Sequence, residues 1–360
     1  MGLSACAGSG PQSAIEPQSP QAESINNLWL LVYYIAAVIF FLVMAALIYT
    51  IIRYRERPGD DRQPVQLHGN TALEITWTII PAVILAVIAV PTVRGVFELR
   101  EAPSGEDVVN VRVTGHQWWW EFEYVDFTNE AGEPLITANE LHLPVGKEAS
   151  FVMTSADVIH SFWIPPLMGK RDVVPGRITA LSFEPSNITP QGQPIFGQCA
   201  EFCGLAHADM RMRVFVHSEA DFADWVEAQA APSAVPTEGL EAAGWETFNA
   251  VCTACHQSTV LNEGVIETVG PYNTLEVDDL TCVSSLGPNL THFGRRTTFA
   301  AASYDNTVEH LAAWLANPSD LKPMDPDRND IAAGLILGMP NFNLDDDEIA
   351  GLIALLRLWE

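Results

Sequence analysis

The sequence predicts a multidomain protein: a membrane hairpin of two helices, then a β-sandwich or barrel, then a helical domain. Two long uncharged apolar runs near the start predict the hairpin, and short alternating runs between Gly105 and His217 predict the β-domain. Helical patterns after Glu238 predict the last domain. A length of 360 residues is sufficient for these parts.

Composition and charge exclude some classes of protein and some classes of partner. The chain has 45 acidic and 18 basic side chains, a net charge of −27, which argues against a nucleic-acid partner and favours a basic partner. An apolar content of 48% excludes a largely disordered chain. The acidity is uneven, because residues 218–360 hold 23 acidic and 5 basic residues, a net −18. We therefore expect the C-terminal part to steer a basic donor, and reduction by that donor to slow as salt rises.

Residues 26–96 are predicted to form the transmembrane hairpin. The run from Leu28 to Ile52 carries no charge, and neither does the run from Ile75 to Val93. A helix of about 20 apolar residues crosses a bilayer, so both runs are long enough. The loop between them is placed in the cytoplasm by its arginines: Arg53, Arg55, Arg57 and Arg62. The chain after residue 94 is then expected outside, on the periplasmic side of a bacterial cell membrane.

Residues 1–25 are predicted to be a flexible leader, because they are rich in Ser, Gly, Pro and Gln. Within them, Leu3-Ser4-Ala5-Cys6 resembles the lipobox at which bacterial lipoproteins are cleaved and lipidated. That reading places a lipid anchor on Cys6. A chance match stays open, because the basic and apolar regions that accompany a lipobox are not found before it in this sequence.

Residues 105–217 are predicted to form the β-domain, because Gly and Pro separate runs of alternating character. These runs are Val108–Thr114, Trp118–Tyr124, Ala149–Thr154, Ile178–Phe183 and Met212–His217. Residues 218–240 are predicted to be a short helix, Ala220–Gln229, and a Pro/Ala/Ser linker. Residues 241–360 form the helical domain, with helices predicted at Leu240–Ala250, Asn306–Ala316 and Asp345–Leu358.

The first of two cysteine clusters lies near the end of the β-domain. Two thiols, an imidazole and a thioether occur within twelve residues: Cys199, Cys203, His207 and Met210. Such soft ligands suit copper. Zinc and a Cys199–Cys203 disulfide are the alternatives, although zinc seldom uses methionine. A further ligand is expected from elsewhere, and His160 follows a predicted strand about forty residues upstream.

His160 and the C-x-E-x-C-G-x-x-H-x-x-M segment together resemble the binuclear copper centre, CuA, of cytochrome c oxidase subunit II. The resemblance implies a cupredoxin-like β-barrel in which Cys199 and Cys203 bridge two coppers. It implies one histidine on each copper and weaker ligation by the Met210 thioether and the Glu201 carbonyl. In the family, the side chain of that glutamate also reaches a magnesium ion at the interface with the catalytic subunit.

Two further segments follow the order of the same family. Gly115-His116-Gln117-Trp118-Trp119-Trp120 resembles its aromatic segment, and Trp118 matches the residue through which electrons arrive from cytochrome c. Packing alone is the alternative reading of these tryptophans. Glu74 opens a segment that resembles the family's second helix, where a glutamate lies near the mouth of a proton path. A carboxylate at a membrane boundary also occurs as a plain interfacial charge.

The second cysteine cluster is Cys252-Thr-Ala-Cys255-His256. C-x-x-C-H is the attachment motif of haem c: the thiols add to the haem vinyl groups and the histidine binds the iron. A redox dithiol is the alternative, but it has no use for the histidine. The segment from Gly287 to His292 resembles that of an all-α class I cytochrome c, in which the carbonyl of Pro288 orients the axial histidine.

The opposite axial ligand is expected to be a methionine. Met339 precedes a helix in a pattern that resembles the usual ending of these domains, and we favour it over Met324, which lies in an apparent insertion. Residues 257–286 are longer than a compact cytochrome needs, and they contain Cys282, which is expected to be structural or free.

The resemblance covers the chain from about residue 25 and implies subunit II of a haem–copper oxidase with a fused cytochrome c domain. A cytochrome c-type or reductase-linked donor would reduce the haem, and electrons would pass through CuA. A separate subunit I, with other oxidase subunits, would reduce O2 and pump protons. A CuA-containing nitric oxide reductase subunit and a membrane-tethered electron carrier stay open. Cys199 and Cys203 argue against a quinol-oxidising subunit.

Overall fold

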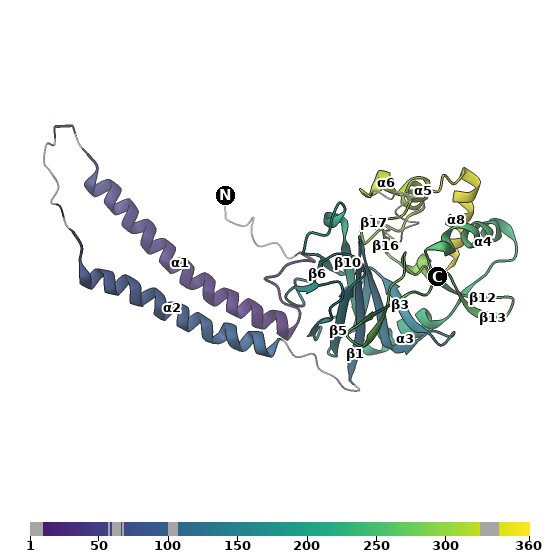
Figure 1. The fold of residues 1–360 in the computed structure, drawn as a ribbon, viewed down its shortest axis with the longest axis horizontal. Helices are drawn as coiled ribbons and strands as arrows, with labels where there is room; N and C mark the ends of the chain where they lie inside the picture. The colour runs from purple at the N-terminus through teal and green to yellow at the C-terminus, as the bar shows by residue number, and fades with distance from the viewer. Residues whose placement is uncertain (1–9, 57, 60–65, 67, 100–106, 325–337) are drawn as a thin grey trace. The chain divides into compact units, whose positions relative to one another are not determined.

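The computed structural model describes residues 10–56, 58–59, 66, 68–99, 107–324 and 338–360. The chain divides into two compact units (Figure 1). Residues 23–100 form one unit, which contains the two long helices, and residues up to 22 and from 101 to 360 form the other. Cys6, the predicted site of a lipid anchor, lies outside the described residues.

The predicted membrane helices are confirmed as α1 (Pro20–Tyr54) and α2 (Thr71–Glu98). Both are long and apolar enough to cross a membrane, as judged by length and composition. Asn70 caps α2, since its side chain accepts a hydrogen bond from the Leu73 amide at 3.2 Å. Its own amide donates to Oε1 of Glu74, also at 3.2 Å. Glu74 therefore completes a capping arrangement in the first turn of α2.

Two five-stranded sheets form the β-domain, which is a sandwich of the predicted kind. The first sheet has the order β3-β2-β1-β5-β8: β1 (Val108–His116), β2 (Trp119–Thr128), β3 (Pro134–Ala138), β5 (Glu148–Ser155) and β8 (Thr179–Phe183). The second has the order β4-β10-β9-β6-β7: β4 (Glu140–Pro144), β6 (His160–Trp163), β7 (Arg171–Val173), β9 (Ile195–Cys199) and β10 (Arg211–His217). Buried aromatic rings such as Trp120, Phe122 and Phe162 fill the space between them.

Part of the predicted linker forms a short β-strand that pairs with the C-terminal domain. After α3 (Glu219–Ala230), the short strand β11 (Ser233–Ala234) pairs in parallel with β12 (Ser258–Asn262). β12 pairs in turn with β13 (Val265–Val269). The linker thus adds an edge strand to the C-terminal domain.

Helices form the core of the C-terminal domain, as predicted: α4 (Gly239–Val251), α5 (Val308–Ala316), α6 (Pro318–Leu321) and α8 (Asp346–Leu358). A capping box at Asp345 and Glu348 begins α8. Among the residues that the structure describes, single 3₁₀ turns lie at His207–Asp209, Cys252–Ala254 and Phe293–Arg295. A continuous apolar core joins α4, α5 and α8, and includes Phe248, Leu311, Leu352 and Trp359.

Strands in the C-terminal domain were not expected from the sequence. Besides β12 and β13, the domain contains β14 (Thr274–Val277), β15 (Leu280–Val283), β16 (Thr298–Phe299) and β17 (Tyr304–Asp305). The β14–β15 hairpin lies against the sandwich, where Oγ1 of Thr114 donates to the Val283 carbonyl at 2.9 Å. The segment 257–286, which is longer than a compact cytochrome needs, therefore contacts the β-domain.

Candidate cofactor pocket and metal centre

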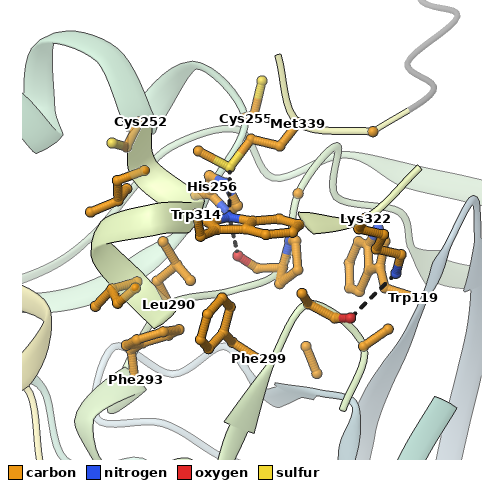
Figure 2. A pocket seen from close by; sticks show the side chains of 18 of the residues that line it. Trp119, Cys252, Cys255, His256, Leu290, Phe293, Phe299, Trp314, Lys322 and Met339 are labelled. Carbon is orange, nitrogen blue, oxygen red and sulfur yellow. Dashed lines mark hydrogen bonds between the residues drawn. The ribbon is translucent and has the colours of Figure 1, made fainter. Parts of the chain in front are cut away.

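A large pocket opens at the predicted haem site, with an empty volume of about 1310 Å³ including the part open to solvent. Cys252, Cys255 and His256 line one part of it. Figure 2 shows Trp119 and Lys322 at the other end, with apolar side chains of the C-terminal domain between them. These include Leu290, Phe293, Phe299 and Trp314. An apolar cavity with two thiols and an imidazole in its wall fits a covalently attached haem.

His256 is held as the sequence predicts. Its Nδ1 hydrogen-bonds the Pro288 carbonyl at 2.7 Å, so Nε2 is the nitrogen available to a ligand. Burial lowers the pKa of His256, which favours the neutral ring that a metal requires. A Cβ on Gly287 would lie 2.7 Å from Cε1 of this ring. The glycine therefore permits the close approach of the loop to the imidazole.

Both candidate methionines line the pocket. Sδ of Met339 accepts a hydrogen bond from Nε1 of Trp314 at 3.2 Å, and Met324 also lies in the pocket wall. Met339 as the ligand stays a prediction. His292 is not available as an iron ligand in place of a methionine, because both of its ring nitrogens contact carbonyl oxygens. Its Nδ1 lies 2.9 Å from the Glu360 carbonyl oxygen, and its Nε2 lies 2.6 Å from that of Ala231.

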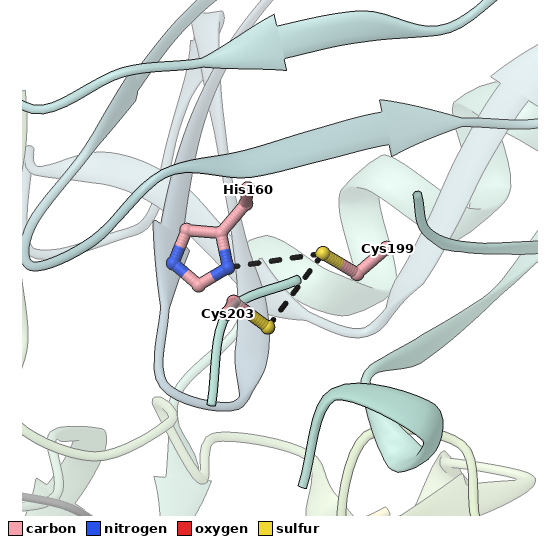
Figure 3. A group of neighbouring side chains, drawn as sticks. All are labelled: His160, Cys199 and Cys203. Carbon is pink, nitrogen blue, oxygen red and sulfur yellow. Dashed lines mark hydrogen bonds between the residues drawn. The ribbon is translucent and has the colours of Figure 1, made fainter. Parts of the chain in front are cut away.

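The first cysteine cluster converges at one edge of the sandwich (Figure 3). Cys199 ends β9 and His160 begins β6, and these two strands are paired. The two cysteine Sγ atoms lie 3.7 Å apart, and Sγ of Cys199 lies 3.9 Å from Nδ1 of His160. Both thiols are free and buried, which argues against the disulfide alternative.

The other three predicted ligands lie beside the thiols. Sγ of Cys203 is 3.5 Å from Nδ1 of His207 and 3.8 Å from Sδ of Met210. The Glu201 carbonyl is 3.1 Å from Sγ of Cys199. The structure thus brings together all six side chains and carbonyls that the sequence singled out.

Asp157 was not singled out by the sequence analysis. Its Oδ1 lies 2.9 Å from Nε2 of His160, so it turns Nδ1 of the ring toward the thiols. The same carboxylate accepts hydrogen bonds from the Gln117 and Val158 amides, each at 2.6 Å. The sequence did contain one signal for this role, because Asp157 is a carboxylate three residues before the predicted ligand His160.

The electrostatics of the thiol pair favour a bound cation. The hydrogen bond between the two thiols lowers the pKa of Cys199, whereas the same bond and burial raise the pKa of Cys203. Burial acts to lower the pKa of His160, but its hydrogen bonds to Asp157 and Cys199 leave that pKa raised. Two buried thiols that cannot both ionise alone fit a soft metal, which would neutralise both thiolates.

Trp118 joins the two sites. Its Nε1 donates to the Cys203 carbonyl at 2.9 Å, and the same residue lines the cofactor pocket. The C-terminal domain covers Trp118, which is 4% exposed. Lys322 approaches from that domain, with Nζ 2.8 Å from the Trp118 carbonyl oxygen. Burial lowers the pKa of Lys322 to about 7. No sequence motif surrounds Lys322, so its role could not be predicted from the sequence.

Family profiles match three successive parts of the chain. The transmembrane domain of cytochrome c oxidase subunit II matches residues 12–94, and its periplasmic domain matches residues 128–217. Cytochrome c matches residues 241–359. The matches follow the order membrane helices, sandwich, helical domain.

Relatives that are named cytochrome c oxidase subunit 2 align with most of the chain. The protein of Alkalihalophilus pseudofirmus is 34% identical over 99% of this chain and 93% of its own length. That of Bacillus subtilis is 32% identical over 86% of this chain and 84% of its own length. A solved periplasmic domain of subunit II from Bradyrhizobium japonicum is 29% identical and covers 36% of this chain and 96% of its own, with a TM-score of 0.32.

Fold and sites together define a membrane-anchored electron-transfer protein with a copper-binding type of β-domain and a cytochrome c domain. The chain belongs to the cytochrome c oxidase subunit 2 family. It is the subunit of a haem–copper oxidase that receives electrons, and its domains imply copper and haem c as cofactors. Subunit I and other oxidase subunits are therefore its partners.

Proposed function

We propose that this chain holds a binuclear copper centre and one covalent haem c, and that Trp118 lies on the electron path between them. When bound, these two groups supply one-electron chemistry. The observation that best supports this electron path is that Trp118 contacts both sites. It lines the cofactor pocket and also donates a hydrogen bond to the Cys203 carbonyl at 2.9 Å.

In this proposal, the thiolates of Cys199 and Cys203 and the imidazoles of His160 and His207 would hold the two coppers. Met210 and the Glu201 carbonyl are weaker ligands. Burial of the thiols excludes water, and paired strands hold His160 and Cys199. A rigid frame of this kind keeps the ligand geometry constant, which lowers the reorganisation that electron transfer requires.

The haem ligands in this proposal come from the C-terminal domain. Cys252 and Cys255 form the thioether links, and His256 is an axial ligand oriented by the Pro288 carbonyl. Met339 is the opposite ligand, and Met324 is its less favoured alternative. Residues 241–360 then form the cytochrome c domain, and residues 105–217 form the copper domain.

Four further assignments extend the same proposal. The electron donor is a basic cytochrome c-type or reductase-linked protein, which the acidic C-terminal part would attract. The side chain of Glu201, which is exposed, reaches a magnesium ion at the interface with subunit I. Glu74 lies at the mouth of a proton path, and Cys6 carries a lipid anchor.

Spectra of the purified full-length chain test the two cofactors directly. We expect the visible bands of haem c and the near-infrared band of binuclear copper, with two coppers and one haem per chain. The loss of either set of bands from a folded, fully loaded preparation would remove the corresponding site assignment.

Replacing Asp157 with alanine is expected to weaken copper binding by about 10- to 100-fold. The change removes the carboxylate that orients His160 at 2.9 Å, while all six proposed ligands remain. A copper titration followed by the near-infrared band measures the effect. Asp172→Ala, at an exposed position on β7, is the control and should leave the affinity unchanged.

A further inference from the structure

Where the cytochrome c domain meets the sandwich, each domain places one buried ionisable side chain in hydrogen bonds with the other domain. Glu140, at the start of β4 in the sandwich, is 5% exposed. Its Oε1 accepts four hydrogen bonds from two consecutive threonines of the cytochrome c domain. The amide and hydroxyl of Thr297 lie at 2.9 and 2.5 Å, and those of Thr298 both lie at 2.9 Å.

Lys322 makes the reverse connection. It belongs to the cytochrome c domain and is 3% exposed, and its Nζ donates to the Trp118 carbonyl of the sandwich at 2.8 Å. A second bond, at 3.3 Å, goes to the Ala300 carbonyl of its own domain. A neutral amine carries two N–H donors and an ammonium three, so both protonation states can make these bonds.

Neutral groups satisfy both charged side chains. Within the described ranges, no ion pair joins either Glu140 or Lys322 to an opposite charge. A buried charge is costly unless hydrogen bonds compensate it. All four donors to Glu140 and the nearer acceptor of Lys322 lie on the other domain. A shift of one domain would therefore remove the donors to Glu140 and leave Lys322 with the Ala300 carbonyl alone. The arrangement therefore selects one docking position.

In this docked arrangement, both proposed redox sites lie next to the segment that contains Trp118 and Trp119. Lys322 holds the carbonyl of Trp118, and Trp119 packs against Ala138 of the sandwich and Ala301 of the cytochrome c domain. Glu140 follows Ala138 by two residues. Lys322 itself lines the cofactor pocket, and Glu140 binds Thr298, which also lines it.

We propose that Glu140 and Lys322 are positioning residues that fix the cytochrome c domain on the copper domain in one docked arrangement. Electrons then cross between the domains without a domain movement, a consequence that rests on the function proposed above. The docking itself does not depend on the cofactors, because all of its contacts are between groups of the chain.

Amide hydrogen exchange of the full-length chain in its oxidase complex tests the docking. The Arg211 amide donates to the Ala301 carbonyl at 3.2 Å, and the Val283 amide donates to Glu123 at 3.4 Å. Both bonds cross the domain contact, and neither involves the side chain of Glu140 or Lys322. In Glu140→Ala and in Lys322→Met, we expect both amides to exchange about tenfold faster or more, the factor expected when charge-assisted hydrogen bonds are lost. Electron transfer from haem to copper should slow in both variants, and in Glu140→Ala the spectra of both cofactors should stay unchanged.

Two exposed or peripheral charges supply matched controls. Glu309→Ala changes an exposed glutamate on α5, and Lys147→Met removes a lysine paired with Glu219 at 2.6 Å. Neither should change exchange at Arg211 or Val283. Faster exchange at Thr297 and Thr298 alone would make Glu140 a local cap and overturn the proposal.

A folding defect can be recognised and avoided. Loss of protection at Leu355, in the core of α8, would show that Glu140→Ala unfolds the cytochrome c domain. Glu140→Gln retains an Oε1 acceptor without the charge, and the same two amides then decide the outcome. If the unsubstituted protein lacks the haem or copper spectrum, the proposed function is wrong. The hydrogen-exchange measurement still tests the docking in that case, because the docking contacts do not involve the cofactors.

Discussion

Replacing Cys199 with serine is expected to abolish the binuclear copper centre and with it the transfer of electrons to subunit I. Sγ of Cys199 contacts three of the other proposed ligands, which are Cys203, His160 and the Glu201 carbonyl. A serine hydroxyl does not ionise at neutral pH and is a hard ligand, so it cannot bridge two soft metals. The loss should exceed the roughly 10- to 100-fold that removal of an outer hydrogen bond costs.

Copper content, the near-infrared band and oxygen uptake of the assembled oxidase measure this effect. Met210→Leu is the graded comparison, because Met210 contacts the cluster through one atom pair at 3.8 Å. We expect it to retain copper with an altered band. Cys282→Ser changes a buried thiol that belongs to neither cluster, and it should leave the copper content unchanged. Two coppers per chain in Cys199→Ser would contradict the bridging role.

The copper ligands could be predicted because most of them are local in sequence. Cys199, Cys203, His207 and Met210 lie within one turn-rich segment, and their spacing already suggests a soft metal. His160 lies far away along the chain and joins them only because β6 pairs with β9. Asp157 escaped notice because its role depends on the direction of one ring nitrogen, which no spacing reveals.

The domain contact could not be predicted, because it depends on pairs that are far apart in the sequence. Thr114 and Val283 are separated by 169 residues, and Lys322 and Trp118 by 204. The strands β12 to β15 are short and partly exposed, so they lack the clear alternation that marks a buried strand. The sequence suggested Trp118 as the point of electron entry, but only the structure shows that it is buried and that it lines a pocket together with residues of the fused domain.

The amphipathic helices of the cytochrome c domain were easier to predict than the way they cross. Their apolar spacing and the acidic start of α8 mark their extents. The crossing point is set by two glycines, Gly244 in α4 and Gly351 in α8, where the two backbones touch. Glycine inside a helix is unfavourable by itself, so such positions become understandable only in the packed structure.

Replacing Gly244 with alanine is expected to destabilise the cytochrome c domain by about 3 kcal/mol, the upper end of the usual cost of overpacking. A Cβ on Gly244 would collide with the Gly351 carbonyl and lie 3.1 Å from the Leu352 amide nitrogen. These obstacles are backbone atoms that cannot rotate away, so α4 and α8 must separate. Separation would expose the core around Phe248 and Trp359 and open the wall of the haem pocket.

Thermal unfolding of the full-length chain, followed at the haem bands, measures the change in Tm, and the copper band reports the sandwich separately. Gly351→Ala is the matched variant, since its Cβ makes milder contacts: the Gly244 nitrogen at 2.9 Å, the Gly244 Cα at 3.1 Å and the Leu240 carbonyl oxygen at 3.4 Å. We expect it to lower Tm less than Gly244→Ala does. Intrinsic helix propensity has the opposite sign, because it favours alanine over glycine by about 1 kcal/mol. A higher Tm in Gly244→Ala would therefore show that propensity, and not the contact between α4 and α8, governs this position.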